Sequence, residues 1–260
     1  MNKLTVVTVC YNAVCCIEKT IQSVINQRYS DFEYIVIDGK STDGTFELIN
    51  RYRREINTFI SESDSGIYDA MNKAIKVATG DYVLFLNADD ILFDEMVLEN
   101  IASHIKMNCA DIYYGNVLIV NEYGKFMQKP QPIELLNTKM IFSHQAVFAK
   151  LSILKNHLFD LQYKYSADFE QLSSLYLGGY RFKYIDNVIS IVPVNSGATY
   201  NNYIVSLKEH FKILEQRGYN VSYWKEKTLF LSGLVRVLKK ITPNFVLYPA
   251  LRYLSRYKIL

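Results

Sequence analysis

The chain has 260 residues and a formal net charge of +3; half of its residues are hydrophobic and 21% are charged. This composition excludes a disordered or collagen-like chain, and the length fits one large domain, with or without a tail, better than several independent cores. Charge is divided unevenly, because residues 202–260 contain 11 Lys or Arg and 3 Asp or Glu, a net charge of +8, whereas residues 1–201 contain 18 and 23, a net charge of −5.

Strand and helix patterns alternate over the first 120 residues. Short runs of β-branched and other apolar residues predict buried strands at residues 4–10, 32–37, 58–61 and 82–86. Apolar residues that recur at helical spacing predict helices between these strands, at residues 17–25, 46–53 and 67–78. The alternation is typical of βαβ units, and it therefore predicts an α/β fold with a parallel sheet.

The second half of the chain is less regular. We expect two further strands at residues 111–120 and 188–194, helices at residues 133–140, 166–177 and 202–217, and broken apolar stretches at residues 229–238 and 245–254. No run of eighteen uninterrupted apolar residues indicates a transmembrane helix, and the apolar start of the chain fits a buried strand better than a signal peptide. The four cysteines form no CxxC pair, so we expect reduced thiols in a cytoplasmic protein.

Polar side chains follow each of the four N-terminal strands, and parallel sheets bind ligands at the carboxyl ends of their strands. These side chains are Tyr11 and Asn12, then Asp38, then Glu62 and Asp64, and finally residues 87–90. The chain contains neither a GxGxxG nor a GxxxxGK[ST] motif, so neither a dinucleotide site of the Rossmann type nor a P-loop is supported. The strand ends are therefore the candidate ligand site.

Residues 87–90, Asn-Ala-Asp-Asp, place two adjacent carboxylates directly after a buried strand. Adjacent carboxylates repel each other, and Mg²⁺ or Mn²⁺ relieves that repulsion by binding one or two carboxylates together with substrate phosphates. The alternative is structural, because Asp-Asp is also common at the start of a helix, which would here begin near Phe93 or Asp94. The tetrapeptide alone leaves both interpretations open.

Two other polar clusters also have structural alternatives. Asp38 can accept from a nucleobase N–H or a ribose hydroxyl, or Asp38, Ser41 and Asp43 can only build the turn and cap; both interpretations can hold, with Asp38 facing the ligand and residues 41–43 building the loop. Asp69, Asn72 and Lys73 lie at i, i+3 and i+4, hence on one helix face. Taken alone, that spacing favours a solvated face with an internal ion pair.

Four segments with these polar residues occur in series, at residues 6–12, 36–45, 64–73 and 80–90. Together they resemble the family-2 glycosyltransferases over about residues 1–195, and in particular members that assemble bacterial surface polysaccharides. The resemblance implies an inverting enzyme of the GT-A fold, with a Rossmann-like, mostly parallel central sheet flanked by helices, and a nucleotide-sugar donor. It implies a transferase domain at residues 1–200 and a basic, amphipathic helical extension at residues 201–260.

The resemblance also implies donor contacts, position by position. Asp38 would bind the base of the nucleotide, and Asp89, in the place of an Asp-x-Asp motif, would hold Mn²⁺ or Mg²⁺ on the diphosphate. The first acid of that motif is Asn87 here, which can hydrogen-bond a ribose hydroxyl but adds no charge, and Asp90 would compensate. The residues expected to bind the nucleotide sugar are Thr8, Tyr11, Asn12, Asp38, Asp64, Asn72, Lys73, Asn87, Ala88 and Asp89.

Residues 166–170, Ser-Ala-Asp-Phe-Glu, match the family segment that carries the catalytic base. Inversion requires a carboxylate that takes the proton of the attacking acceptor hydroxyl. Asp168 starts a predicted helix, whose partial positive charge favours the ionised carboxylate, although such an acid can also serve only as a cap. We prefer Asp168 to Glu170 as the base. Candidate contacts to the acceptor or diphosphate are His144, Gln145, Glu170 and Asp90.

We therefore expect a metal-dependent, inverting glycosyltransferase that moves a sugar from a nucleoside diphosphate donor, in the first place a UDP-sugar, to a hydroxyl of a glycan or lipid-linked acceptor in polysaccharide biosynthesis. One alternative is a nucleotidyltransferase acting on a sugar phosphate, although the glycine-rich basic loop of that class is missing after the first strand. The other is a catalytically inactive scaffold at a membrane surface.

The basic C-terminal extension has three interpretations. It can pack on the domain, bind nucleic acid, or lie on an anionic membrane surface. No nucleic-acid recognition motif accompanies its charge, whereas a basic segment with Tyr, Phe and Leu suits an anionic leaflet. We therefore expect no nucleic-acid partner, and we expect either packing on the core or peripheral attachment to the inner face of the membrane.

Overall fold

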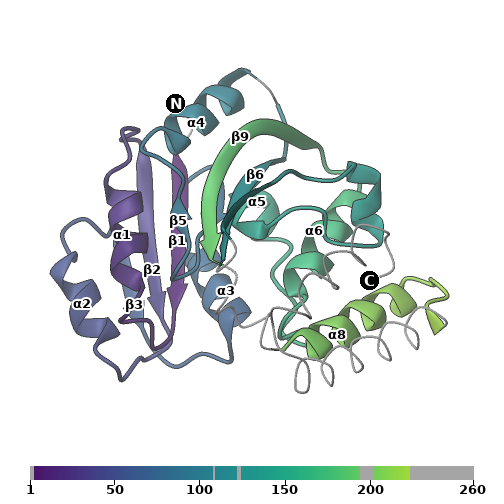
Figure 1. The fold of residues 1–260 in the computed structure, drawn as a ribbon, viewed down its shortest axis with the longest axis horizontal. Helices are drawn as coiled ribbons and strands as arrows, with labels where there is room; N and C mark the ends of the chain where they lie inside the picture. Colours follow the sequence, from purple (N-terminus) through teal and green to yellow (C-terminus); the bar gives the residue numbers. More distant parts are fainter. Residues whose placement is uncertain (1–2, 108, 122–123, 194–201, 223–260) are drawn as a thin grey trace. The chain divides into compact units, whose positions relative to one another are not determined.

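The computed structural model describes residues 3–107, 109–121, 124–193 and 202–222. The chain divides into two compact units, Met1–Asn201 and Asn202–Leu260. Among the residues described, the strands of the first unit form one nine-stranded sheet with the order β3-β2-β1-β4-β8-β6-β9-β5, and β7 pairs with β6 outside this path (Figure 1).

The N-terminal half of the sheet is parallel, as the sequence predicts. Its strands are β1 (Leu4–Cys10), β2 (Phe32–Asp38), β3 (Thr58–Ser61) and β4 (Tyr82–Phe85). The connecting helices are α1 (Ile17–Ile25), α2 (Thr45–Arg51) and α3 (Ile67–Val77). All seven side chains of β1 are buried. Successive strand side chains point to opposite faces, so β1 is covered on both sides.

Helices cover the two faces of these parallel strands. Leu4 and Val6 of β1 belong to one apolar cluster with Ile17 and Ile21 of α1 and Ile49 of α2. Helix α3 packs against β1 and β2 and buries an apolar stripe of its own. This arrangement directs the carboxyl ends of β1 to β4, and the polar loops after them, to one edge of the sheet.

The second half of the sheet is mixed. Its strands are β5 (Ile91–Leu92), β6 (Ile112–Asn121), β7 (Gly124–Gln128), β8 (Val147–Lys150) and β9 (Phe182–Pro193), of which β9 forms a long arc in Figure 1. Strand β8 pairs antiparallel with β4 and with β6, and β6 pairs parallel with β9. Antiparallel β8 therefore joins the parallel half of the sheet to the remainder.

Several elements of this half differ from the predicted ones. The expected helix at residues 133–140 is a short 3-10 helix, η1 (Ile133–Asn137), and the expected last strand begins earlier, at Phe182, while Val194 lies outside the described residues. Residues 91–92 form β5, which pairs with β9, so the helix after the Asp-Asp pair does not start near Phe93: α4 runs over Val97–Met107. The remaining helices are η2 (His144–Ala146), α5 (Leu151–Leu154) and α6 (Ala167–Leu177).

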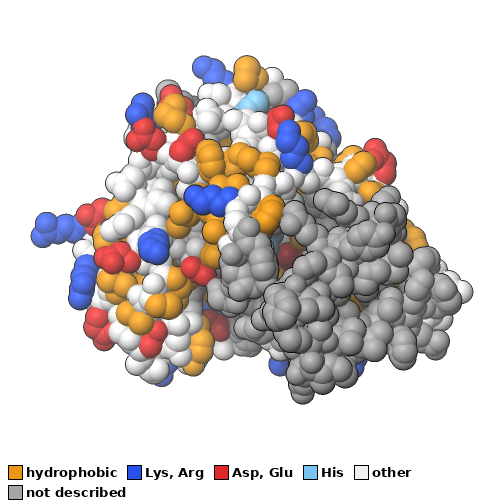
Figure 2. All heavy atoms as spheres, in the orientation of Figure 1, with side chains coloured by type: hydrophobic (Ala, Val, Ile, Leu, Met, Phe, Trp, Pro, Cys, Tyr) orange, Lys and Arg blue, Asp and Glu red, His pale blue; other side chains and the backbone are white. Residues whose placement is uncertain are grey.

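The second unit is described only over residues 202–222. Helix α8 (Tyr203–Gln216) corresponds to the amphipathic helix predicted at residues 202–217. The apolar stretches at residues 229–238 and 245–254 lie outside the described residues. Within the described part of the chain, no helix combines the length and the apolar character needed to cross a bilayer. Figure 2 shows acidic and basic side chains interspersed on the described surface of this face.

Candidate active site

The loops after β1 and β2 are joined by hydrogen bonds at the carboxyl edge of the sheet. The backbone N–H of Asn12 donates to Ser41 Oγ at 2.8 Å, and the side-chain oxygen of Asn12 accepts from the Thr42 N–H at 2.9 Å. The Val14 N–H donates to the carboxylate of Asp43 at 3.1 Å. Asn12 has a positive φ of 50°, which Asn tolerates better than most residues. Two loops 30 residues apart are thus held as one surface.

Asp38 lies fully buried at the end of β2. Its carboxylate accepts from the Ser41 N–H at 3.1 Å, from the Ser41 hydroxyl, and from the Ser61 hydroxyl at 2.6 Å. Asp38 therefore builds the loop and ties it to the end of β3, the structural role considered for it. Thr8 is buried as well, and its hydroxyl accepts from the Tyr34 hydroxyl at 3.0 Å in the interior of the sheet.

Tyr11, Gly39 and Asp64 meet above these buried groups. A Cβ atom on Gly39 would lie 2.6 Å from the Asp64 carboxylate and 3.3 Å from the Tyr11 ring, so a larger residue there would displace the Asp64 side chain. The Tyr11 side chain is 65% exposed, and Asp64 accepts from the Gly66 N–H at 2.9 Å. The exposed Tyr11 ring can stack on a flat polar ligand, and the neighbouring Asp64 carboxylate can accept a hydrogen bond from a hydroxyl of that ligand.

The start of α3 carries an ion-pair cluster, as the spacing favours. Lys73 donates to Glu62 at 2.9 Å and to the Ser63 carbonyl at 2.7 Å, and it lies 3.7 Å from Asp69. Asn72 does not share this face. Its side chain is buried and exchanges two hydrogen bonds of 2.9 Å with the backbone of Phe159. Asn72 therefore fastens a distant loop to α3.

Residues 87–90 present their two acids differently. The Ala88 N–H donates to the Val9 carbonyl at 3.2 Å, which fixes this loop against β1. Asp89 is partly exposed, has a positive φ of 93°, and donates its N–H to the Thr20 hydroxyl at 3.1 Å. A positive φ on a residue other than glycine costs on the order of 1 kcal/mol, and strained residues of this kind cluster at functional sites.

Asp90, in contrast, is buried. Burial raises the pKa of Asp90 to about 7, against the opposing charge of His144 and a hydrogen bond with Gln145. The raised pKa of Asp90 weakens the repulsion between the two adjacent carboxyl groups. Asp89 is therefore the acid of this pair that reaches the surface at the strand ends.

A chain of hydrogen bonds links Asn87, His144, Asp168 and Tyr68. His144 Nδ1 lies 3.1 Å from Asp168 Oδ2, and His144 Nε2 lies 3.0 Å from the side-chain nitrogen of Asn87. The Tyr68 hydroxyl and the backbone N–H of Phe169 each donate to Asp168 Oδ1 at 2.9 Å. The loop after β4, the 3-10 helix η2 and the helices α3 and α6 therefore meet at one carboxylate.

This network keeps Asp168 ionised. Burial favours the protonated carboxyl, but the hydrogen bond and charge of His144, with hydrogen bonds from Tyr68 and the Phe169 N–H, hold the pKa of Asp168 below its usual value. Burial likewise acts to lower the pKa of His144, but Asp168 and the charge of Asp90 raise it. A carboxylate that stays charged in a partly buried place can accept a proton from a bound hydroxyl.

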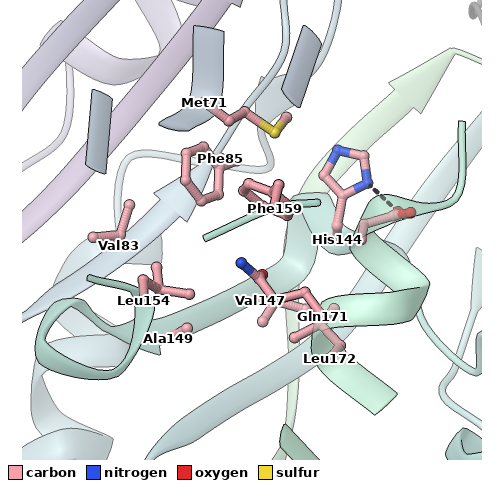
Figure 3. A pocket seen from close by; sticks show the side chains of 11 residues that line it. Met71, Val83, Phe85, His144, Val147, Ala149, Leu154, Phe159, Gln171 and Leu172 are labelled. Atoms are coloured by element: carbon pink, nitrogen blue, oxygen red, sulfur yellow. Dashed lines mark hydrogen bonds and ion pairs between the residues drawn. The ribbon is translucent and has the colours of Figure 1, made fainter. Parts of the chain in front are cut away.

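An apolar cavity lies beside His144 and Asp168 (Figure 3). Its other lining residues are Met71, Val83, Phe85, Val147, Ala149, Leu154, Phe159, Gln171 and Leu172. Such a wall excludes water on one side of the His144–Asp168 pair and so strengthens the attraction between them.

The structure thus brings together some of the predicted residues and leaves others apart. His144 contacts both Asn87 and Asp168, and Gln145 contacts Asp90. Glu170 accepts from the Ser174 hydroxyl at 2.8 Å along α6. Sequence reasoning misses Tyr68, for which the only available signal is its place within the motif at residues 64–73. Among the residues described, no group of three or more His, Cys, Asp and Glu side chains is arranged to hold a metal.

Comparison with known proteins gives a consistent result. Residues 5–166 match Glycosyl transferase family 2. The PGL/p-HBAD biosynthesis glycosyltransferase of Mycobacterium tuberculosis is 29% identical over 168 residues, which are 61% of this chain and 64% of that protein. The putative teichuronic acid biosynthesis glycosyltransferase TuaG of Bacillus subtilis is 32% identical over 136 residues, which are 50% of this chain and 54% of that protein. The chain therefore spans less than two thirds of the length of these relatives.

Solved structures share the fold at lower identity. The structure of S. aureus TarS 1-349 in complex with UDP-GlcNAc has a TM-score of 0.69 and 22% identity, over 82% of this chain and 64% of that one. The mannosyltransferase PcManGT from Pyrobaculum calidifontis, in complex with GDP-Man and Mn²⁺, has a TM-score of 0.65 and 17% identity, over 99% of this chain and 80% of that one. At these identities the likeness concerns the fold, and it supports the α/β architecture predicted from the sequence.

Proposed function

Because this chain belongs to glycosyl transferase family 2, we propose that it transfers a sugar from a nucleotide-sugar donor to a hydroxyl of a glycan or lipid-linked acceptor in surface polysaccharide biosynthesis. The observation that carries the proposal is the hydrogen-bonded path from Asn87 through His144 to Asp168. This path connects the candidate base Asp168 to Asn87, which lies 81 positions earlier in the chain, in the loop that stands where the family has its Asp-x-Asp motif.

The donor would lie over the loops at the carboxyl edge of the sheet. Tyr11 and Asp64 would contact the base and ribose, and Asp38, beneath them, would hold that pocket in shape and bind the base. The proposed donor is a UDP-sugar, in keeping with the UDP-GlcNAc bound by TarS, and transfer would invert the configuration at the sugar carbon. Slow hydrolysis of a panel of nucleotide sugars would identify the donor.

The proposed cofactor is Mn²⁺ or Mg²⁺, and the mannosyltransferase neighbour is in complex with Mn²⁺. Asp89 would hold the ion with its single surface carboxylate, and the ion would supply positive charge to the departing diphosphate. A donor set of one carboxylate suits Mg²⁺-like ions, which commonly take their other ligands from substrate phosphates and water. Such further ligands would be needed, because among the described residues no group of three or more His, Cys, Asp and Glu side chains could hold an ion by itself.

Asp168 would act as the catalytic base. As the acceptor oxygen forms its bond to the sugar carbon and the bond to the diphosphate breaks, the hydroxyl proton would pass to Asp168. The placement of Asp168 at the start of α6 and the hydrogen bonds that keep it ionised both suit this role. The proposal leaves His144 as a partner of the base.

The proposal is tested with Asp168→Asn, measured for sugar transfer and separately for binding of UDP with Mn²⁺. Loss of a general base typically costs 10²- to 10⁴-fold, so we expect transfer to fall by about that factor while UDP affinity changes less than about twofold. Glu170→Gln on the same helix is the matched variant. If it lowered sugar transfer more than Asp168→Asn does, Glu170 and not Asp168 would be the base. Loss of UDP binding along with transfer would make Asp168 structural instead.

Asp89→Asn tests the proposed metal contact. We expect UDP affinity to lose its dependence on Mn²⁺, and full metal-dependent turnover by this variant would refute the assignment.

Two other classes of function are distinguished at the same time. Release of pyrophosphate from a sugar phosphate and a nucleoside triphosphate would indicate a nucleotidyltransferase, and wild-type chain without metal-dependent UDP affinity would indicate a scaffold.

A further inference from the structure

His144 lies between the loop that follows β4 and the candidate base. Its ring contacts Asp168 Oδ2 through Nδ1 and the Asn87 amide nitrogen through Nε2, at 3.1 Å and 3.0 Å. The side-chain oxygen of Asn87 is buried and has no hydrogen-bond partner among the residues that the structure describes. Asn87 thus presents a donor to His144 and keeps its acceptor for another group.

The position of the proton on His144 follows from these contacts. In this orientation of the Asn87 amide its nitrogen faces the ring, and because an amide nitrogen only donates hydrogen bonds, the orientation assigns Nε2 as the accepting, unprotonated nitrogen. The ring proton then lies on Nδ1, where it donates to the Asp168 carboxylate. In the opposite tautomer, two lone pairs would face each other at Asp168 and two donors would face each other at Asn87.

We propose that Asn87 and His144 position the catalytic base: Asn87 holds His144 in the tautomer with its proton on Nδ1, and this N–H orients Asp168 toward the acceptor hydroxyl. This inference rests on the proposed function of Asp168. His144 is here a positioning residue, which keeps its own proton throughout the transfer.

The hydrogen bonds of Asp168 leave one place for the incoming proton. Oδ1 accepts twice, from the Tyr68 hydroxyl and from the Phe169 N–H, whereas Oδ2 accepts once, from His144. Each carboxylate oxygen has two acceptor positions. The remaining position on Oδ2 therefore receives the acceptor proton while the hydroxyl oxygen bonds to the sugar carbon and the diphosphate leaves with the electron pair of the broken bond.

The charge of His144 matters because two acids face it, Asp168 from α6 and Asp90 from the loop after β4. Both favour the imidazolium, and a cation in contact with Asp168 would make the carboxylate a weaker base. Asn87 acts in the opposite direction, because in this orientation its N–H groups, and not its oxygen, face Nε2 and so oppose a second ring proton. An Asp at this position would accept from Nε2 and favour the imidazolium. The replacement of the first motif acid by Asn87 thus has a physical consequence at the base.

The tautomer of His144 is measured directly by NMR on the full chain labelled with ¹⁵N-histidine. The chain contains only four histidines, so the spectrum has few signals. Loss of one signal set in His144→Gln assigns His144. In the wild type, at a pH above the titration midpoint of His144, we expect the neutral ring to carry its proton on Nδ1. In Asn87→Asp we expect protonation on both nitrogens and a titration midpoint about 1 unit higher or more, as for a carboxylate within hydrogen-bond distance. A proton on Nε2 in the neutral wild-type ring, or an unchanged ring in Asn87→Asp, would overturn the proposal.

The effect on the base is measured with His144→Phe and His144→Gln. In His144→Phe the Nδ1 donor is lost, and burial then raises the pKa of Asp168. The acid limb of the kcat/KM profile should therefore move to higher pH. At neutral pH we expect kcat to fall about 10- to 100-fold, while the KM for the donor changes little. His144→Gln, which keeps a donor, should recover part of this loss. His157→Phe is the matched control, because the His157 ring contacts the Tyr180 hydroxyl at 3.0 Å and not Asp168.

The outcomes separate this inference from the proposed function. An unshifted acid limb in His144→Phe, together with an inactive Asp168→Asn, would refute positioning by His144 and retain Asp168 as the base. Full transfer by Asp168→Asn would refute the proposed function, while the NMR result would still decide the tautomer. If His144→Phe fails to fold, His144→Gln and the wild-type spectrum keep the inference open to refutation.

Discussion

Glu33 is a buried carboxylate at the opposite end of the parallel strands from the candidate site. It accepts from the Thr5 hydroxyl at 2.6 Å, the Thr79 hydroxyl at 2.7 Å, the Gly80 N–H at 2.8 Å and the Thr79 N–H. Lys3 lies 3.5 Å away. Burial acts to raise the pKa of Glu33, but these hydrogen bonds lower it below the usual value. One side chain thus ties the starts of β1, β2 and β4 together.

Glu33→Gln should therefore destabilise the fold by about 2–4 kcal/mol, because the new amide N–H₂ faces donors and leaves them unpaired. The free energy of unfolding is measured in urea, with Glu47→Gln on the exposed face of α2 as the same chemical change without burial. Equal losses in the two variants would contradict the prediction.

The same residue predicts a dependence on pH. Because the pKa of Glu33 is lower in the folded chain, its stabilising effect is fully present above the unfolded value near 4.5 and is lost as the pH falls through the folded value. The difference between wild type and Glu33→Gln should accordingly shrink below about pH 4.5. If the difference in the free energy of unfolding between wild type and Glu33→Gln stayed constant down to pH 3, the stabilising effect of Glu33 would come from packing and not from its charge.

At the scale of the elements, local pattern is sufficient for the parallel half of the fold. Strands β1 to β4 are buried, regular and separated by helices, so their apolar runs and turns give the bounds almost to the residue. The antiparallel strands are different. Strand β8 has four residues, and β5 has two, and each exists because of a partner far along the chain, such as β9 for β5. No local period carries that information.

The misplaced Asn72 has a related cause. Helical spacing places it on a face with Asp69 and Lys73, but α3 is buried over a wide stripe that includes Tyr68, Met71 and Asn72 itself. Spacing shows which residues are neighbours and not which of them face the core. For the same reason, spacing cannot find Tyr68 as a partner of Asp168, 100 residues further along.

The pairing of β6 with β9 depends on Gly115. The register shifts on either side of Asn116, next to this glycine, and a Cβ there would lie 2.7 Å from Ile189 Cγ1 and 2.8 Å from the Asn187 carbonyl oxygen. Gly115→Ala should therefore force the strands apart and cost about 1–3 kcal/mol in the free energy of unfolding, as overpacking does. Lys125→Ala on the exposed β7 is the control. A loss no larger than that of the control would show that the strands yield without strain.

For the whole molecule, the uneven charge distribution is the feature that the fold alone does not explain. The family match ends at residue 166, and the basic segment, with a net charge of +8, lies in the second unit of the chain. A sugar acceptor bound to a lipid would require the enzyme to work at a bilayer, and anionic lipids attract basic segments there. We propose peripheral attachment through residues 202–260 as the reason for this charge.

This proposal predicts that the full chain binds vesicles containing anionic lipid and not neutral phosphatidylcholine vesicles. Binding should be lost in about 1 M salt, where the Debye length falls to roughly 3 Å. Because each basic residue near such a surface contributes about 1 kcal/mol, the double variant Lys239→Glu and Lys240→Glu should bind at least roughly 30-fold more weakly. The matched control reverses two exposed basic residues of the first unit, Arg51→Glu and Arg54→Glu. An equal loss in the control, or binding that ignores lipid charge, would indicate that the basic segment serves the fold or another partner.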